Sequence, residues 1–135
     1  MKRLFLLPVL LLLVFHCNLT FAAEKWFLLY QDNEVRSFLD TENFECVNAG
    51  VAITYDCWIK TEGYGGTELV HMKVADYGDT IEFLITEVSV YDKNGNYKGG
   101  EKPSNPEWQK PDPGSSTEKL INKVIDWEAP KKLCK

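Results

Sequence analysis

Cys57 and His71 are the two residues whose types could support nucleophilic catalysis. Both fall in segments that alternate apolar and polar residues, so they can lie on neighbouring strands, where an imidazole activates a thiol. The sequence supplies no third residue to orient His71 and no loop suited to stabilise an oxyanion. A structural cysteine and a surface histidine explain the pair better, and we predict that the protein is not an enzyme.

A metal site is the second kind of chemistry to consider. The segment Asp92-Lys-Asn-Gly-Asn96 begins like a calcium-binding loop, but Tyr97 stands where that loop needs glycine and Pro103 where it needs glutamate. A two-residue type I′ hairpin turn at Asn94-Gly95 explains the segment better. His71 is the only histidine beyond the amino-terminal segment, so several histidines cannot share a metal. We expect neither a metal nor a cofactor.

Three aromatic residues, Trp58, Tyr64 and Trp108, are candidates for contact with a partner. Tryptophan and tyrosine are enriched at the energetic centres of interfaces. Trp58 lies on the polar side of its predicted strand, Tyr64 in a glycine-rich turn and Trp108 in a proline-rich loop. Both tryptophans also suit the core of a small domain, so that alternative stays open.

Residues 1–22 have the pattern of a secretory signal peptide. Lys2-Arg3 precedes an apolar run from Leu4 to Phe15, and small residues stand at the spacing of a cleavage site after Ala22, with Ala23 as the alternative. The run is short for a membrane span. The residues before Cys17 are too large for a lipid-attachment site. We therefore expect export to the periplasm, the cell surface or the medium, without a lipid anchor.

Residues 23–135 would then form a single small domain. Loss of Lys2 and Arg3 lowers the formal charge by two, from −5 to −7. An acidic domain has no electrostatic footprint for nucleic acid or anionic lipid. Its apolar and aromatic content supports a real core, and it contains no further run long enough to span a membrane.

Three cysteines, Cys46, Cys57 and Cys134, remain after cleavage, and an oxidising compartment favours one disulfide and one free thiol. If Cys46 precedes an extended strand that holds Cys57, roughly 15–20 Å separates them at ~3.3 Å per residue, beyond the ~7 Å limit for a bridge. Cys134 follows the predicted helix and can reach either one. We favour Cys57–Cys134, because Cys57 shares the apolar face of its strand. The main alternative is Cys46–Cys134, and Cys46–Cys57 or no bridge also remain open.

The stretch from Ser115 to Trp127 has the one convincing helical pattern in the mature chain. Its apolar residues form a broad face: Leu120, Ile121, Val124, Ile125 and Trp127. Ser115 and Glu118 have the spacing of a capping box, and Pro130 stops the helix.

Six upstream segments have the alternation and the bounding turn residues of strands. They are 26–30, 35–39, 51–61, 69–77, 81–91 and 97–101, with 41–50 expected as a loop. These elements predict an α+β domain, an antiparallel meander of about six strands with one carboxy-terminal helix packed across one face.

The fifth predicted strand changes phase along its length. Ile81, Phe83 and Ile85 share one parity, whereas Val88 and Val90 have the other. A β-bulge near Thr86-Glu87 would turn both sets toward one core, and a strand that is apolar on both sides fits equally well.

Several short motifs recur in a recognisable order. They are Trp26, Phe38-Leu-Asp40 before Thr41, Trp58 with Lys60, Tyr91-Asp92…Gly95, and Trp108…Pro113-Gly-Ser-Ser-Thr-Glu118. Over nearly the whole mature chain this order resembles the surface-adhesin protein E family of exported bacterial proteins. Relatives often carry cysteines in a late strand and at the helix end, where this chain has Ile81 or a neighbour and Ile125. A tether between helix and sheet, if kept, would have moved to Cys134.

The resemblance implies a six-stranded sheet crossed by a carboxy-terminal helix, binding to host matrix or serum proteins, and no catalysis. We therefore expect a non-catalytic, adhesin-like binding protein whose contact surface is the uncovered sheet face. The alternative is a periplasmic domain that binds a small ligand, inhibits an enzyme or has a structural role in the envelope. An exposed aromatic patch on the uncovered face favours the first function, and a closed apolar pocket between helix and sheet favours the second.

Overall fold

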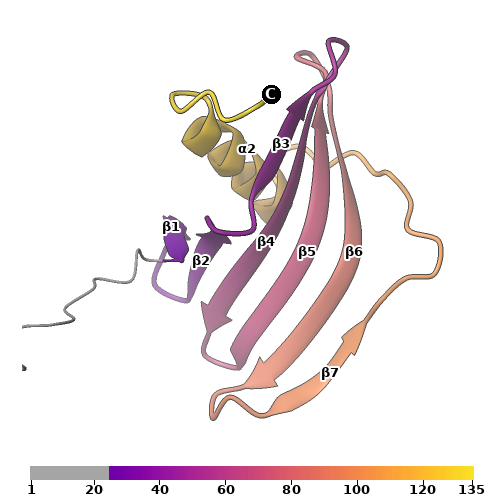
Figure 1. Cartoon of the computed structure of the whole chain (residues 1–135). Helices are drawn as coiled ribbons and strands as arrows, with labels where there is room; N and C mark the ends of the chain where they lie inside the picture. The colour runs from indigo at the N-terminus through magenta and orange to yellow at the C-terminus, as the bar shows by residue number, and fades with distance from the viewer. Residues whose placement is uncertain (1–24) are drawn as a thin grey trace, which may run out of the picture.

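The computed structural model describes residues 25–135, so the predicted signal peptide, with Cys17 and the cleavage position Ala22, lies outside the described residues. The described part is an α+β domain of seven antiparallel strands and one carboxy-terminal helix, which confirms the predicted fold class (Figure 1). The elements are β1 (Trp26–Gln31), β2 (Val35–Asp40), β3 (Glu45–Asn48), β4 (Ile53–Gly63), β5 (Gly66–Asp76), β6 (Ile81–Asp92), β7 (Tyr97–Glu101) and α2 (Ser116–Glu128).

The sheet has the order β1-β2-β4-β5-β6-β7, and β3 lies off this path. One edge of β4 is shared, because β2 pairs with its second half and β3 with its first half. Between them Asp40 makes a local turn, in which its Oδ1 accepts the N–H groups of Glu42 and Asn43. The prediction of a loop over 41–50 is therefore wrong for Glu45–Asn48, a strand too short to show alternation.

A β-bulge in β6 resolves the phase change of this strand. His71 of β5 pairs with Glu87, whereas its neighbour Met72 pairs with Ile85, so Thr86 is the extra residue. The bulge turns the residues on either side of it toward the same face, as one of the two predicted alternatives requires. Thr86 thereby becomes available on the opposite face, where it makes contacts described below.

The β6–β7 hairpin forms at the predicted place but with another turn. The N–H of Gly95 donates to the carbonyl of Asp92, and Gly95 has a φ of +82°, whereas Asn94 does not have a positive φ. A type I′ turn needs positive φ at both positions, so that prediction is wrong. The Asp92 carboxylate, a ligand in the calcium-loop alternative, instead accepts the N–H groups of Asn94 and Asn96.

Helix α2 lies on the concave side of the curved sheet (Figure 1). The Oγ of Ser115 accepts the N–H of Glu118 at 3.1 Å, and the Glu118 carboxylate accepts the N–H of Gly114 at 2.6 Å. The predicted capping box is thus present, with Gly114 in place of Ser115 as the second donor. The buried core between helix and sheet consists of Leu29, Leu39, Tyr55, Cys57, Ile59, Met72, Val74, Phe83, Ile121 and Val124.

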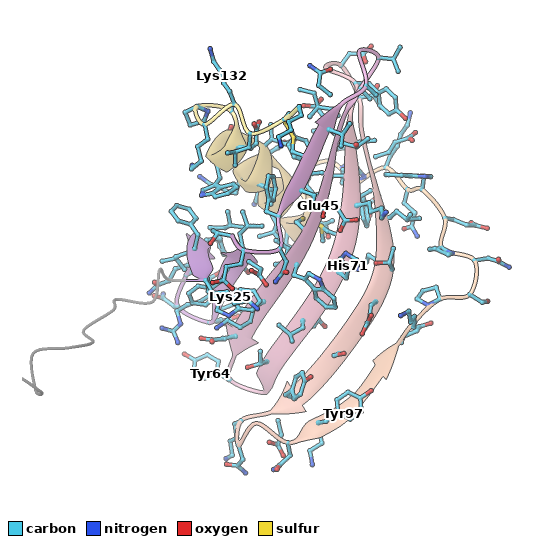
Figure 2. The ribbon with its side chains drawn as sticks, in the orientation of Figure 1. Lys25, Glu45, Tyr64, His71, Tyr97 and Lys132 are labelled. Carbon is cyan, nitrogen blue, oxygen red and sulfur yellow. A yellow bond between two sulfur atoms is a disulfide. The ribbon has the colours of Figure 1, made fainter. Side chains whose placement is uncertain are left out.

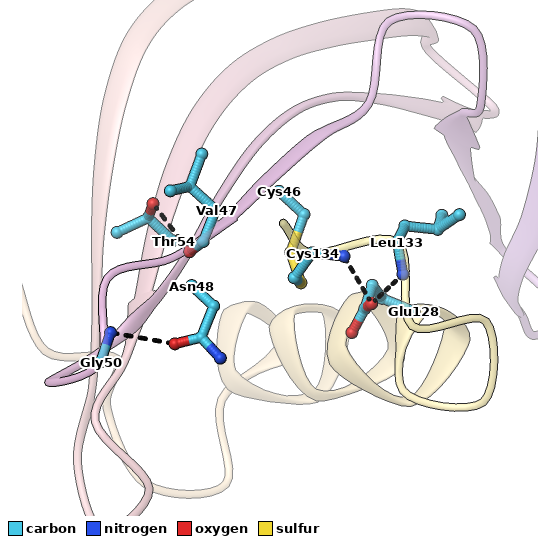
Figure 3. Close-up of a disulfide and its surroundings, with 8 residues drawn as sticks. All are labelled: Cys46, Val47, Asn48, Gly50, Thr54, Glu128, Leu133 and Cys134. Atoms are coloured by element: carbon cyan, nitrogen blue, oxygen red, sulfur yellow. Dashed lines mark hydrogen bonds between the residues drawn. A yellow bond between two sulfur atoms is a disulfide. The ribbon is translucent and has the colours of Figure 1, made fainter.

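The disulfide joins Cys46 to Cys134, with Cα atoms 4.6 Å apart, and Cys57 is a buried free thiol (Figure 3). The favoured pairing of Cys57 with Cys134 is therefore wrong, and the main alternative is right. Cys57 lies in the core, where its side chain is fully buried. The tail instead runs along β3, where the N–H of Asn48 donates to the carbonyl of Lys135. Strand β3, which was not predicted from the sequence, places Cys46 within bonding distance of Cys134.

Candidate functional site

The sheet face opposite α2 carries no helix in the described part of the chain, and we call it the open face. Tyr55 and Cys57 are buried toward the helix, so the alternating residues of β4 point to the other side. The open face comprises Thr54, Asp56, Trp58 and Lys60 of β4, with His71 and Lys73 of β5. Figure 2 shows His71 on the near side of the sheet, with α2 behind it. The predicted position of Trp58 on this face agrees with the register.

At the centre of the open face the ring of Trp58 stacks on that of His71, with centroids 4.6 Å apart and planes 6° apart. The two residues are direct partners in the β4–β5 ladder. His71 Nε2 lies 2.5 Å from the Asp56 carboxylate, and Nδ1 lies 2.8 Å from the Thr86 hydroxyl. The Asp56 carboxylate also pairs with Lys73 at 3.2 Å. The imidazole is therefore held at both nitrogens and on one ring face.

The order carboxylate, imidazole, hydroxyl in Asp56, His71 and Thr86 is that of a nucleophilic relay. Thr86 Oγ1, however, also lies 3.2 Å from the carbonyl oxygen of His71, to which it donates. The Thr86 hydroxyl therefore divides its contacts between the backbone carbonyl and the imidazole. Two cavities, the cleft between α2 and the sheet and a depression beside the β1–β2 and β4–β5 turns, are not lined by these side chains. The contacts of Asp56 and Thr86 orient the His71 ring.

The Cys57–His71 pair considered from the sequence is not formed. Cys57 is the ladder partner of Met72, so its thiol faces the core while His71 faces the opposite side. Burial, with a smaller contribution from the charge of Asp56, raises the pKa of the Cys57 thiol to about 12. A neutral, enclosed thiol is not a nucleophile.

A second aromatic group, missed in the sequence, extends the open face across β2 to β1. The Lys60 ammonium lies 4.6 Å from the ring centroid of Phe38 and 5.0 Å from that of Trp26. Lys60 also pairs with Glu62 at 2.8 Å. Leu28, a ladder partner of Phe38, is 43% exposed on the same face. The signal that would have found this group is the pairing of three strands, which the one-dimensional pattern does not contain.

The structure does not bring the three predicted partner-binding residues together. Trp58 is half-buried at the middle of the sheet. Tyr64 is 82% exposed in the β4–β5 turn, where its hydroxyl donates to the carbonyl of Asn33. Trp108 is 46% exposed, next to Gln109, which pairs with Phe83 at the edge of β6. Trp58 is thus the one candidate at the centre of the open face.

The concave side holds a cleft of about 420 Å³ between the first turn of α2 and the sheet. It is partly open to solvent, unlike the closed pocket that would favour a small-ligand protein. Its lining consists of Tyr30, Asp32, Val35, Ser37, Ile59, Thr61, Glu68, Val70, Met72, Ile85, Ser116, Thr117, Lys119 and Leu120.

Within residues 25–135, one group of three side chains has the types and proximity of metal ligands: Cys46, Glu128 and Cys134. The disulfide uses both sulfur atoms of this group. The carboxylate of Glu128 accepts the N–H groups of Leu133 at 2.8 Å and Cys134 at 3.3 Å (Figure 3). These contacts anchor the carboxy-terminal tail and leave no thiolate for a metal.

The disulfide fits an oxidising compartment outside the cytoplasm. Among the described residues, α2 is too short and too polar to cross a membrane, and no other helix there could do so. No protein-family model, no curated protein and no solved structure matches the chain.

Proposed function

We propose that this chain is an exported, non-catalytic binding protein that recognises another protein through its open face. The observation that carries the proposal is the Trp58–His71 stack, a rigid aromatic platform on a sheet face that α2 leaves uncovered. Binding orders the side chains of an interface at a cost in entropy, and rings that are already fixed reduce that cost. Asp56 and Thr86 fix His71, and His71 in turn supports Trp58.

The charges around the platform favour a polypeptide as the partner. Both signs are interspersed, with Lys73 beside Asp56 and with Lys60 and Arg36 beside Glu62. A surface of mixed charge lacks the single-sign field that recognises nucleic acid. The resemblance to the surface-adhesin protein E family supports a host matrix or serum protein as the partner class.

The test is binding of the purified exported protein, immobilised on a surface, to a panel of extracellular-matrix and serum proteins. We expect saturable binding to at least one member. Trp58→Ala should weaken it by about 30-fold, as expected for a hot spot of ~2 kcal/mol. The matched control is Tyr77→Ala, which removes a ring that is 47% exposed in the turn after β5.

Two results contradict the proposal once circular dichroism has shown that each variant is folded. Absence of saturable binding to every panel member removes the adhesin-like function and leaves the structural envelope role. Binding that Trp58→Ala leaves unchanged, but Tyr64→Ala or Trp108→Ala abolishes, moves the contact surface to the loops.

A further inference from the structure

The cleft on the concave side is independent of the open face, because the sheet separates the two. Its volume of about 420 Å³ lies within the ~300–1,000 Å³ of pockets that enclose small molecules. Three walls bound it: the sheet, the first turn of α2, and the β1–β2 hairpin with Tyr30 and Asp32. Its aliphatic lining consists of Val35, Ile59, Val70, Met72, Ile85 and Leu120.

The cleft exists because α2 is shorter than the sheet that it covers. The helix has 13 residues, about 20 Å at ~1.5 Å per residue, whereas β4 and β5 have 11 residues each, about 36 Å at ~3.3 Å per residue. The buried helix residues Ile121 and Val124 pack on one part of the apolar face. The face continues beyond Leu120 to Val70 and Ile85, which are only half-buried. This stretch of apolar sheet is left without a protein cover.

Hydroxyl groups supply most of the polar lining: Tyr30, Ser37, Thr61, Ser116 and Thr117. Ser37 is only 5% exposed, and its Oγ lies 3.1 Å from Oγ1 of Thr61. One hydroxyl of this pair donates to the other, so the pair keeps one hydrogen and free lone pairs. A ligand group that both donates and accepts a hydrogen bond would pair with this hydrogen and with one of the lone pairs.

The cleft is lined by two carboxylates, Asp32 and Glu68, and one ammonium, Lys119, a formal charge of −1. The Asp32 carboxylate accepts the N–H groups of Glu34 and Val35 and the hydroxyl of Tyr30, so the hairpin uses it. Glu68 of β5 and Lys119 of α2 are exposed and of opposite sign. The net negative charge opposes an anionic ligand. A cationic ligand gains little, because the Asp32 carboxylate already accepts three hydrogen bonds and the exposed Glu68 is screened by solvent.

From this lining we propose that the cleft binds a small, uncharged amphipathic molecule, with an aliphatic body and a hydroxyl, ester or amide head. The aliphatic body lies on Val70, Met72 and Ile85, the part of the apolar sheet face that α2 is too short to cover. The head meets the Ser37–Thr61 hydroxyl pair. This site acts independently of the open face and of any protein partner.

The experiment measures binding of octan-1-ol to the purified exported protein by amide chemical-shift titration, with octanoate and octylamine as matched charged probes. We expect saturable binding of octanol, with shifts at residues of the cleft, and at least tenfold weaker binding of both charged probes. Val70→Phe, which fills the cleft, and Thr61→Val, which removes a hydroxyl at constant shape, should each lower the octanol affinity. Trp58→Ala is the control on the opposite face and should leave it unchanged.

Three results overturn the proposal. One is non-saturable octanol binding to the wild-type protein, and another is equal octanol binding by folded Val70→Phe and Thr61→Val. Tighter binding of octanoate or octylamine than of octanol overturns the uncharged head. The octanol titrations do not depend on the protein-binding assay. A failure of the proposed protein binding would therefore leave the cleft proposal standing, and the reverse also holds.

Discussion

Trp58 and His71 stack face to face across β4 and β5, with their ring centroids 4.6 Å apart. The position of the His71 ring depends on Thr86, whose hydroxyl lies 2.8 Å from Nδ1. Thr86 is available for this contact only because it is the extra residue of the β6 bulge. The bulge therefore does two things: it keeps the apolar residues of β6 on one core, and it fixes the aromatic platform on the other face.

Thr86→Val tests this link between the bulge and the platform. The substitution keeps the shape of the side chain but removes the hydroxyl that binds His71, so we expect a loss of about 1 kcal/mol in the free energy of unfolding. The aromatic circular-dichroism signal of Trp58 should also fall as the ring gains freedom. Unchanged stability together with an unchanged aromatic signal would show that Thr86 does not position the stack.

Removal of the disulfide should destabilise the domain strongly. Cys46 and Cys134 are separated by 88 residues, so the bridge restricts a long segment of the unfolded chain. Cys134→Ser should therefore lower the free energy of unfolding by roughly 2–5 kcal/mol in a denaturant titration. Non-reducing peptide mapping of the wild-type protein should yield a Cys46–Cys134 peptide, and a Cys57–Cys134 peptide would contradict the structure.

The Cys57 thiol should be inert in the folded protein. Burial and the nearby charge of Asp56 raise its pKa to about 12, so almost no thiolate exists at pH 8. We expect no reaction with Ellman's reagent in native buffer and one thiol per chain in denaturant. Fast reaction of the native protein would mean that α2 opens readily from the sheet.

Asp40 should make the domain sensitive to acid. Burial by itself would raise the pKa of Asp40, but hydrogen bonds from Asn43, Lys25 and the backbone outweigh it and hold the pKa below the usual 3.8. Since the folded-state pKa is the lower one, this contribution to stability is present above pH ~4 and is lost as the pH falls through the folded-state value. Asp40→Asn should lower stability at pH 7 and flatten the dependence of stability on pH below pH ~4. If the free energy of unfolding of the variant depended on pH as that of the wild-type protein does, Asp40 would not have this role.

Two substitutions separate the capping of α2 from its packing. Ser115→Ala removes the acceptor for the Glu118 N–H and should cost about 1 kcal/mol. Ile121→Ala removes a fully buried side chain and should cost about 2–5 kcal/mol. Trp127, which the helical pattern places on the same face, is only half-buried against Phe27 and Phe44. Equal, small effects of Ser115→Ala and Ile121→Ala in urea titrations would mean that the helix is not docked.

Much of this architecture follows from local patterns. The alternation from Tyr55 to Ile59 identified β4 and its core face, because successive side chains of a strand point to opposite sides. The capping residue Ser115 and the apolar stripe identified α2 with its face. The predicted strand over 51–61, however, begins two residues too early: β4 begins at Ile53, and Val51, which has the parity of Tyr55 and Cys57, is 81% exposed. Local patterns are least informative at the ends of elements, where pairing decides the boundary.

Tertiary structure alone decided the contacts that matter for the candidate sites. The short strand β3, which carries Cys46 to the tail, forms because an edge of β4 is left open beyond β2. The grouping of Lys60 with Trp26 and Phe38 needs the pairing of three strands. The cleft arises from the difference in length between α2 and the sheet. These are relations between segments distant in sequence, set by register and packing, whereas the sequence by itself records only the preferences of each segment for a helix or a strand and for its buried face.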